Sequence, residues 1–263
     1  MDDGPSVLDR CFAGMRLDLP VDVYHRLPRH PAYKYELIDG TTWLSPRPTS
    51  RDVRRSTAPP YREPDDPSDD PSDELPWGVR VRAYRDGDAD ALPVPFAAAF
   101  ERTVPFCTLD EGALRTAAAD AVAETLGGRH GPLLADVSSV AIDAEGRAFG
   151  AGLVTRAPDT GGPFPEEMRG RPYLTWIFVV PLLSRHGLAR AMLHRALEAL
   201  HRAGEPALYS TFLVGNERSA LWHWDNGFEL LPSPWALARR RVARGRGGEG
   251  SRGGDDAGIE GRQ

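Results

Sequence analysis

The segment from Val180 to Ala189, VPLLSRHGLA, combines features that would let a protein bind a phosphate group. A strand-like apolar run ends at Val180, a polar loop follows, and Gly187 stands where a long amphipathic helix begins. The first N–H groups of a helix have no acceptor inside it, and the helix dipole adds partial positive charge there. We therefore expect an anion site for a group such as pyrophosphate, with Gly187 letting the main chain approach it.

A second segment, NERSALWHWDNGF from Asn216 to Phe228, also carries residues that can do chemistry. His223 can donate a proton when it is protonated, since a histidine has an ordinary pKa of about 6.5. The alternative is a histidine that packs beside its two tryptophan neighbours or lies on the helix surface. Asn216 likewise has a plainer interpretation, because Asn often caps the start of a helix.

These two segments resemble motifs of the GNAT N-acetyltransferases. The family's acetyl-CoA motif runs V-x-P, then an Arg or Gln, then x-x-G-x-G/A at a helix start. An N-x-x-A...Y-x-x-x-G-F segment follows it along the chain. Val180, Pro181, Gly187 and Ala189 occupy places of the first motif, whereas Ser184 stands where the family has Arg or Gln. The resemblance covers roughly residues 77–232.

The resemblance implies that acetyl-CoA is the acyl donor and that a primary amine attacks its thioester directly. It implies an oxyanion held by a backbone N–H near Val179 or Val180. His223 occupies the place of the family's acidic Tyr and is the candidate catalytic residue. The residues that the resemblance assigns to acetyl-CoA are Phe178, Val179, Val180, Ser184, Arg185, His186, Gly187, Leu188, Ala189 and Asn216.

A general base for the acceptor amine is harder to find. Family members often carry a Glu on the central strand or the next one, yet Tyr173–Val180 and Ala207–Val214 contain no carboxylate. Deprotonation through water and a carboxylate from Glu166 or Glu167 stay open as alternatives. A GNAT module that binds acyl-CoA without turnover, with a regulatory or scaffolding role, is the alternative to an N-acetyltransferase. The acceptor is equally open: a small amine, a peptide N-terminus or a lysine.

Composition argues against several other classes of protein. The net charge of −6 argues against nucleic-acid binding through an overall positive field, although an Arg-rich linker and tail leave a weaker nucleic-acid hypothesis. Neither of the two cysteines belongs to a CxxC pair, and His194 and His201 lack a neighbouring carboxylate, so we expect no metal site. The start of the sequence lacks a signal peptide, and no apolar run reaches 18 residues, so we expect a cytoplasmic protein without a membrane span.

Composition shifts divide the sequence into four parts. Residues 1–46 form a small accessory segment with a β-hairpin around Asp39-Gly40, and residues 47–76 form a Pro/Asp-rich linker. Residues 77–238 form the acyltransferase domain, and residues 239–263 an Arg/Gly-rich disordered tail. The hairpin's apolar side chains need a partner, which the main domain or a second copy in a homodimer would provide.

The main domain alternates strand-like and helix-like segments. Its fold class is α/β (α+β), and the resemblance implies a mixed, mostly antiparallel central sheet flanked by helices. Thr108 and Glu111 have the spacing of a capping box and predict a helix that ends at Gly127. Further helices are predicted at Gly187–Ala203 and Asn216–Asn226, and strands at Val79–Arg85, Asp136–Ile142, Ala148–Arg156, Tyr173–Val180, Ala207–Val214 and Gly227–Leu231.

Overall fold

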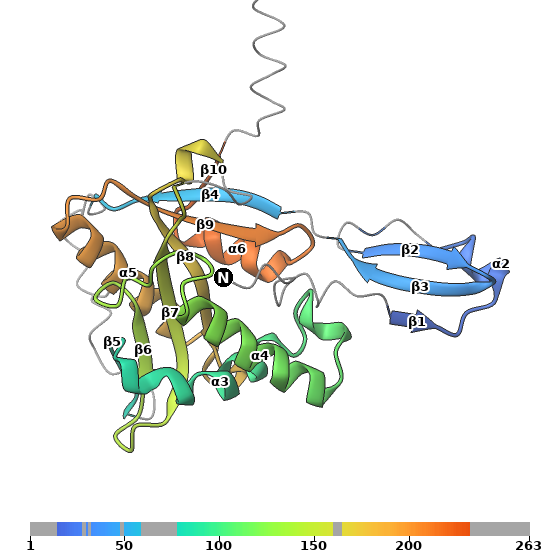
Figure 1. Cartoon of the computed structure of the whole chain (residues 1–263), viewed down its shortest axis with the longest axis horizontal. Coiled ribbons are helices and arrows are strands. Elements are labelled where there is room, and N and C mark those ends of the chain that lie inside the picture. Colours follow the sequence, from blue (N-terminus) through green and yellow to red (C-terminus); the bar gives the residue numbers. More distant parts are fainter. Residues whose placement is uncertain are drawn as a thin grey trace, which may run out of the picture. The chain divides into compact units, whose positions relative to one another are not determined.

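A computed structural model describes residues 15–27, 30, 33–47, 50–58, 78–159 and 165–231 (Figure 1). Most of the predicted linker, from residue 59 onward, lies outside these residues, and so does the predicted tail. The division of the chain into four parts therefore stays a prediction. Among the described residues, every helix is too short or too polar to cross a bilayer.

The centre of the chain is a seven-stranded sheet in the order β10-β4-β9-β8-β7-β6-β5 (Figure 1). The pairs β5–β6, β6–β7, β7–β8 and β4–β9 are antiparallel, and β8–β9 is parallel. The strands are β4 (Ser50–Ser56), β5 (Arg80–Ala83), β6 (Ser139–Ile142), β7 (Ala148–Arg156), β8 (Pro172–Val179), β9 (Ala207–Leu213) and β10 (Glu229–Leu230). The predicted mixed, mostly antiparallel sheet flanked by helices is confirmed.

Helices cover both faces of this sheet. Leu153 and Val154 are neighbours in β7 and so point to opposite faces. Leu153 packs in a core with helices α3 and α4, whereas Val154 packs in a core with α5 and α6. These helices are α3 (Pro93–Phe100), α4 (Glu111–Leu126), α5 (Leu188–Arg202) and α6 (Glu217–Asp225), and short 3-10 helices are η3 (Asp86–Ala91), η4 (Phe106–Thr108), η5 (Glu166–Met168) and η6 (Pro181–Leu183).

The core on the α3 face is built from aromatic rings. Phe96 is fully buried, and its ring lies 4.9 Å from that of Trp176 and 5.2 Å from that of Phe178, both at steep angles. Such edge-on contacts stabilise aromatic pairs beyond the area they bury. The Trp176 indole donates to the Thr125 hydroxyl at 2.9 Å, so its polar atom is satisfied as well. Trp176 and Phe178 are therefore core residues.

Strand β4 corrects the predicted linker. Ser50–Ser56 pairs with β9 along its whole length, from Ser50 opposite Leu213 to Ser56 opposite Ala207. Val53 is the one apolar residue in SRDVRRS and is fully buried, so the segment shows no alternating apolar pattern. Main-chain pairing with an existing strand overrides that weak local preference. The prediction of an unbroken linker from residue 47 is wrong over β4.

The start of α4 differs from the predicted capping box. Asp110 is the N-cap, and its carboxylate accepts from the N–H of Ala113 at 2.8 Å. The Thr108 hydroxyl instead donates to the carbonyl of Pro105 at 3.2 Å, inside η4. The predicted Thr108–Glu111 box is therefore wrong, because a carboxylate two residues later caps the same helix.

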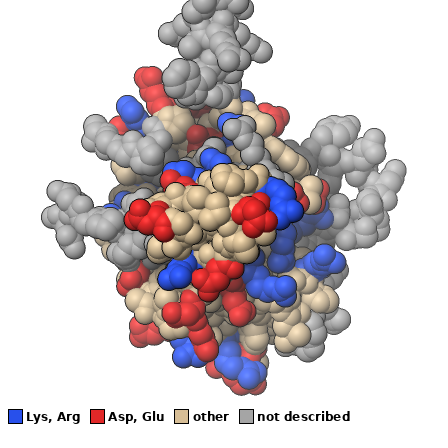
Figure 2. Space-filling view, turned by 90° about the vertical axis from the view of Figure 1, so that its right-hand side faces the viewer, with Lys and Arg blue, Asp and Glu red and all other residues tan. Residues whose placement is uncertain are grey.

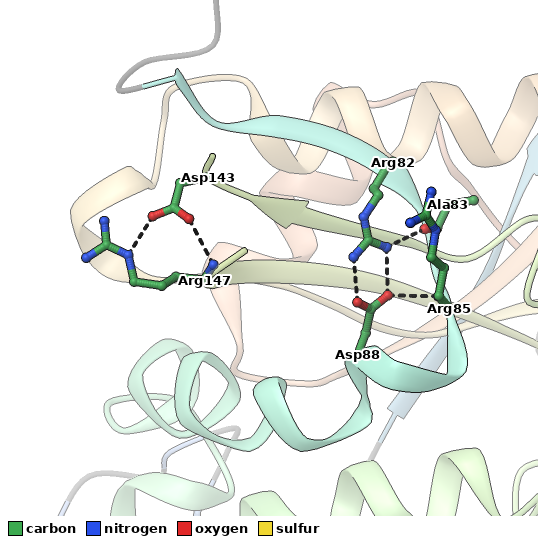
Figure 3. Close-up of polar contacts among 6 residues, drawn as sticks. All are labelled: Arg82, Ala83, Arg85, Asp88, Asp143 and Arg147. Carbon is green, nitrogen blue, oxygen red and sulfur yellow. Dashed lines mark hydrogen bonds and ion pairs between the residues drawn. The ribbon is translucent and has the colours of Figure 1, made fainter. Parts of the chain in front are cut away.

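Two carboxylates on the β5–β6–β7 side of the sheet have structural partners (Figure 3). Asp88 in η3 receives two bonds from the Arg82 guanidinium, at 2.5 and 2.7 Å, and another from the N–H of Arg85. Asp143 accepts from the N–H and the Nε of Arg147, at 2.8 and 2.6 Å, and closes the β6–β7 turn. Both groups are already committed to holding strand ends.

The predicted N-terminal hairpin is confirmed. Asp39 and Gly40 have φ angles of 48° and 75° and form a two-residue turn between β2 and β3. Left-handed φ at both positions is what a type I′ turn requires. The hairpin belongs to a three-stranded sheet in the order β1-β3-β2, with a short helix α2; the elements are β1 (Met15–Leu17), α2 (Val21–Tyr24), β2 (Tyr33–Ile38) and β3 (Thr41–Pro46).

Candidate functional site

The start of α5 presents unpaired N–H groups. Arg185 and Gly187 have left-handed φ angles of 69° and 80°, and no side chain caps the helix. The N–H groups of Arg185, Gly187, Leu188 and Ala189 find no backbone acceptor among the described residues. Alternating left-handed residues and a helix start gather N–H groups into a concave anion site. The role of these four residues in binding acetyl-CoA stays a prediction.

Gly187 is required for a conformational reason. An added Cβ would meet nothing within 4 Å, so the space around it is open. The positive φ is instead what favours glycine, because a residue with a Cβ is strained in that conformation. Arg185 also has a positive φ although it is not glycine, and such local strain is typical of functional sites.

Ser184 is not available as a donor. Its N–H and its hydroxyl both donate to the carbonyl of Pro181, at 3.2 and 2.8 Å, within the turn of η6. The residue that replaces the family's Arg or Gln therefore holds the loop in place. The side chain of Arg185 is exposed, as is that of His186. An anion here would be bound by main-chain N–H groups and by the exposed arginine.

Strands β8 and β9 part soon after they meet. Their parallel pairing covers only Tyr173 opposite Tyr209 and Leu174 opposite Ser210. Beyond this point β8 continues to Val179 and β9 to Leu213 without pairing to each other. The two facing edges carry unpaired main-chain groups, which an extended ligand with amides of its own can satisfy. We call this feature the split.

A β-bulge lies where the split begins. Leu153 of β7 is opposite Trp176, whereas Val154 is opposite Leu174, so Thr175 is the extra residue of β8. The Thr175 hydroxyl lies 2.9 Å from that of Thr155. Bulges redirect the chain and concentrate next to active sites.

The ladder of β8 shows which main-chain groups face the split. The N–H of Val180 donates to the carbonyl of Phe149 in the β7 chain at 2.8 Å. N–H groups alternate between the two edges of a strand, so the N–H of Phe178 also faces β7, and that of Val179 faces the split. Of the two candidate oxyanion donors, Val180 uses its N–H to bond Phe149, whereas the N–H of Val179 faces the split.

Phe178 does not fit the predicted cofactor contacts. Its side chain is 4% exposed and lies in the aromatic core, and its main chain pairs with β7 opposite Ala151. Neither part of the residue faces the split. We leave Phe178 out of the candidate site, whose β8 contribution is the edge at Val179.

Asn216 has the capping role that was one of its two interpretations. Its side-chain oxygen accepts from the N–H of Ser219 at 3.1 Å at the start of α6. This bond uses the acceptor oxygen and leaves the amide NH₂ for other partners. The cofactor-binding role of Asn216 stays a prediction.

His223 is buried, with its exposed fraction at 3%. Its Nδ1 donates to the carbonyl of Ser219 at 2.7 Å, which leaves Nε2 to accept from the Ser210 hydroxyl at 3.0 Å. The rings of Phe212 and Phe228 lie 5.4 and 4.8 Å away. Burial lowers the pKa of His223, so the neutral ring is favoured. The acid role stays a prediction, whereas this geometry favours the packing interpretation.

One of the two loop carboxylates proposed as a general base has a structural partner. Glu167 forms an ion pair with Arg54 of β4 at 3.0 Å, which ties η5 to the sheet. Sequence reasoning missed a third carboxylate, Asp52 of β4, which accepts from the Thr211 hydroxyl at 2.9 Å. No sequence signal was available for Asp52, because it lies in a charged segment without apolar alternation.

Charges of both signs share the surface. On the face drawn in Figure 2, Lys and Arg side chains are interspersed with Asp and Glu among the described residues.

No protein-family model and no curated protein matches this sequence. The structure is similar to a GCN5-related N-acetyltransferase from Sphaerobacter thermophilus, with 14% identity, a TM-score of 0.46, and coverage of 69% of this chain and 48% of that one. It is also similar to PaiA N-acetyltransferase from Thermoplasma acidophilum in complex with coenzyme A, with 11% identity, a TM-score of 0.43, and coverage of 59% and 92%. A third similar structure is a GNAT family acetyltransferase from Brucella melitensis in complex with acetyl-CoA, with 19% identity, a TM-score of 0.36, and coverage of 48% and 71%. The match to the Sphaerobacter protein thus spans about half of that protein's length.

Proposed function

We propose that this chain is a GNAT-type N-acetyltransferase that moves an acetyl group from acetyl-CoA to a primary amine. The observation that carries the proposal is that the split and the N–H groups before α5 follow each other along the chain. Strand β8 borders the split and leads directly into the unpaired N–H groups before α5. A ligand with a pyrophosphate at one end and an extended amide chain at the other suits this arrangement.

Each part of the site has a role in this proposal. The N–H groups of Arg185, Gly187, Leu188 and Ala189 bind the pyrophosphate, and the edge of β8 binds the extended arm. The acetyl thioester then lies in the split, where the N–H of Val179 can donate to its carbonyl oxygen. A preorganised donor at that oxygen stabilises the charge that develops when the amine attacks.

The alternative function is a GNAT module that binds acyl-CoA without turnover. The buried His223 favours it, because a histidine whose two nitrogens bond to protein offers no obvious proton to the departing thiolate. Both functions need the same N–H groups before α5 and the same split. They differ only in whether an amine reacts.

Release of the CoA thiol separates the two functions. The full-length chain is mixed with acetyl-CoA and a panel of propylamine, 1,4-diaminobutane, a lysine-containing peptide and aniline, with thiol detection. The proposal expects amine-dependent release well above an enzyme-free control. Binding of acetyl-CoA without release by any amine would establish the binding module instead, and absence of binding would contradict both functions.

A further inference from the structure

Strand β4 places a carboxylate at the start of the split. Asp52 is opposite Thr211 in the β4–β9 register, and Thr211 is the first residue of β9 past its last pair with β8. The next residue, Val53, is buried in the core shared with α5. Because side chains alternate along a strand, Asp52 points to the opposite face of the sheet.

Three side chains converge at this point. The Thr211 hydroxyl donates to Asp52 Oδ1 at 2.9 Å and also interacts with the half-buried Tyr173. Tyr173 also interacts electrostatically with Asp52. Tyr173, Thr211 and Asp52 come from three different strands, β8, β9 and β4, so only the assembled sheet brings them together.

Asp52 is a partly buried carboxylate without an ion pair among the residues that the structure describes. No Lys, Arg or His among the described residues forms an ion pair with it, although Arg51 lies next to it in sequence and weakly favours its charge. Burial raises the pKa of Asp52, with the Thr211 hydrogen bond acting in the opposite direction. Holding an unpaired carboxylate away from water costs free energy. Such a group is suited to receive a cation from outside the chain.

We propose that Asp52 is the residue that binds the acceptor's ammonium group and takes its first proton. This inference rests on the proposed acetyl transfer and assigns the general base that the sequence did not reveal. It also defines the substrate class: a primary alkylamine that is protonated at neutral pH, in preference to an uncharged arylamine.

The proton balance of the step is complete without another reactant. The acceptor R-NH₃⁺ gives one proton to the Asp52 carboxylate and becomes R-NH₂. Its lone pair attacks the thioester carbon, the C–N bond forms, and the C–S bond breaks with its electron pair leaving on sulfur. The nitrogen then loses a second proton, which neutralises the thiolate, and Asp52 returns its proton to water. The products are R-NH-acetyl, the CoA thiol and one proton.

Thr211 and Tyr173 are positioning residues in this scheme. The Thr211 hydroxyl fixes Oδ1 of Asp52, whereas Oδ2 has no hydrogen bond within the described ranges and can accept from the ammonium group. Burial raises the pKa of Tyr173 to about 12, so its phenol stays protonated and adds no negative charge beside Asp52.

The test compares Asp52→Asn with the full-length wild type in the thiol-release assay, and acetyl-CoA affinity is measured by calorimetry. Propylamine and 1,4-diaminobutane are the probes for a protonated amine, and aniline is the probe for a neutral one. We expect kcat/KM for the alkylamines to fall about 100-fold or more, the range of general-base losses, while the rate with aniline falls less than tenfold. The Kd for acetyl-CoA stays within threefold of wild type.

Two further variants keep the result interpretable. Asp143→Asn is the control, because it removes a buried carboxylate from the β6–β7 turn and should leave kcat/KM unchanged. Asp52→Glu keeps the charge and should recover part of the lost rate, which also covers the case in which Asp52→Asn is unstable.

Every outcome decides the inference. An active wild type whose Asp52→Asn variant stays within threefold overturns the role of Asp52 and leaves acetyl transfer standing. Equal losses with alkylamines and aniline overturn it too, because a proton-accepting role would spare the neutral amine. A wild type that binds acetyl-CoA but acetylates no amine also counts against it, and a wild type that does not bind acetyl-CoA removes the proposed function itself.

Discussion

Ser210 and Thr211 are neighbours in β9, yet their hydroxyls lie on opposite faces of the sheet, at the point where β8 and β9 part. On the α5/α6 face, Ser210 Oγ lies 3.0 Å from the Nε2 of His223 and 3.3 Å from the carbonyl of Leu174. On the other face, Thr211 bonds to Asp52, which has no ion-pair partner among the described residues. The first network is closed by protein groups, whereas the second ends at a half-buried carboxylate.

This difference separates structural polar groups from functional ones. The Ser210 side ties α6, β9 and β8 together at the start of the split, and both ring nitrogens of His223 have a protein partner there. Closed networks of this kind stabilise and specify a core. A partly exposed carboxylate without a cation costs stability instead, and proteins keep such costs where function needs them.

Removing His223 should produce the largest effect, on stability. We expect His223→Ala to lower the free energy of unfolding by about 2–4 kcal/mol, because it leaves a cavity beside Phe212 and Phe228 and removes the bond to Ser210. The melting temperature would fall by roughly 5–15 °C in a thermal unfolding experiment. Leu221→Ala is the control on the same helix, since Leu221 is 60% exposed, and should change stability by under about 0.5 kcal/mol. A shift as small as that of the control would break the comparison.

Removing the two neighbouring hydroxyls one at a time should have opposite effects on activity and on stability. Thr211→Val should lower kcat/KM for alkylamines about tenfold, because Asp52 loses the bond that positions it, with little change in melting temperature. Ser210→Ala should lower the free energy of unfolding by about 1 kcal/mol, because the Nε2 of His223 loses its partner, and leave kcat/KM within about twofold. Steady-state kinetics and thermal unfolding of both variants measure this. The same effect from both substitutions would mean that the two faces do not differ in role.

The pH dependence of stability tests the closed network. Because burial lowers the pKa of His223, the folded chain binds its proton less readily than the unfolded chain does. Stability is therefore fully present above about pH 6.5 and is lost as the pH falls below that value. Thermal unfolding between pH 5 and pH 7.5 should show this loss, and His223→Gln should reduce it. Burial also lowers the pKa of His130, so part of the loss should remain in that variant.

The smallest expected effect concerns the stability of the Asp52 side. Burial raises the pKa of Asp52, so its charged form is disfavoured by folding. Asp52→Asn should keep the melting temperature of the wild type or raise it by about 1–3 °C, although it removes activity. Thermal unfolding at pH 7 measures this shift. A fall of more than about 5 °C would show that Asp52 has a structural role like that of Asp143.

The elements with strong local signals were predictable from the sequence. The periodic helix before Gly204, the apolar run that became β8 and the Asp39-Gly40 turn all lie where the patterns placed them. The main-chain conformation before α5 was predictable too, because it depends on one glycine at positive φ.

The remaining features depend on tertiary contacts that leave no local pattern. Strand β4 contains one apolar residue, and only its pairing with β9 makes it a strand. The role of Asp52 follows from that pairing and so was hidden within a predicted linker. The burial of His223 depends on the turn of α6 toward Phe212, which residue spacing alone does not determine.

Calorimetric titration of acetyl-CoA into the full-length chain and two glycine variants tests the central claim most directly. Gly187 and Gly204 lie at opposite ends of α5, have φ angles of 80° and 75°, and have open space around an added Cβ. A glutamate at either position is therefore strained to a similar degree. Only Gly187→Glu places negative charge at the anion site.

We predict that the wild type binds acetyl-CoA and that Gly204→Glu binds within about threefold of it. Gly187→Glu should bind at least about tenfold more weakly, a difference of about 1.4 kcal/mol. A wild type that does not bind acetyl-CoA, or equal binding by the two variants, would contradict the assignment of the α5 N-terminus as the pyrophosphate site.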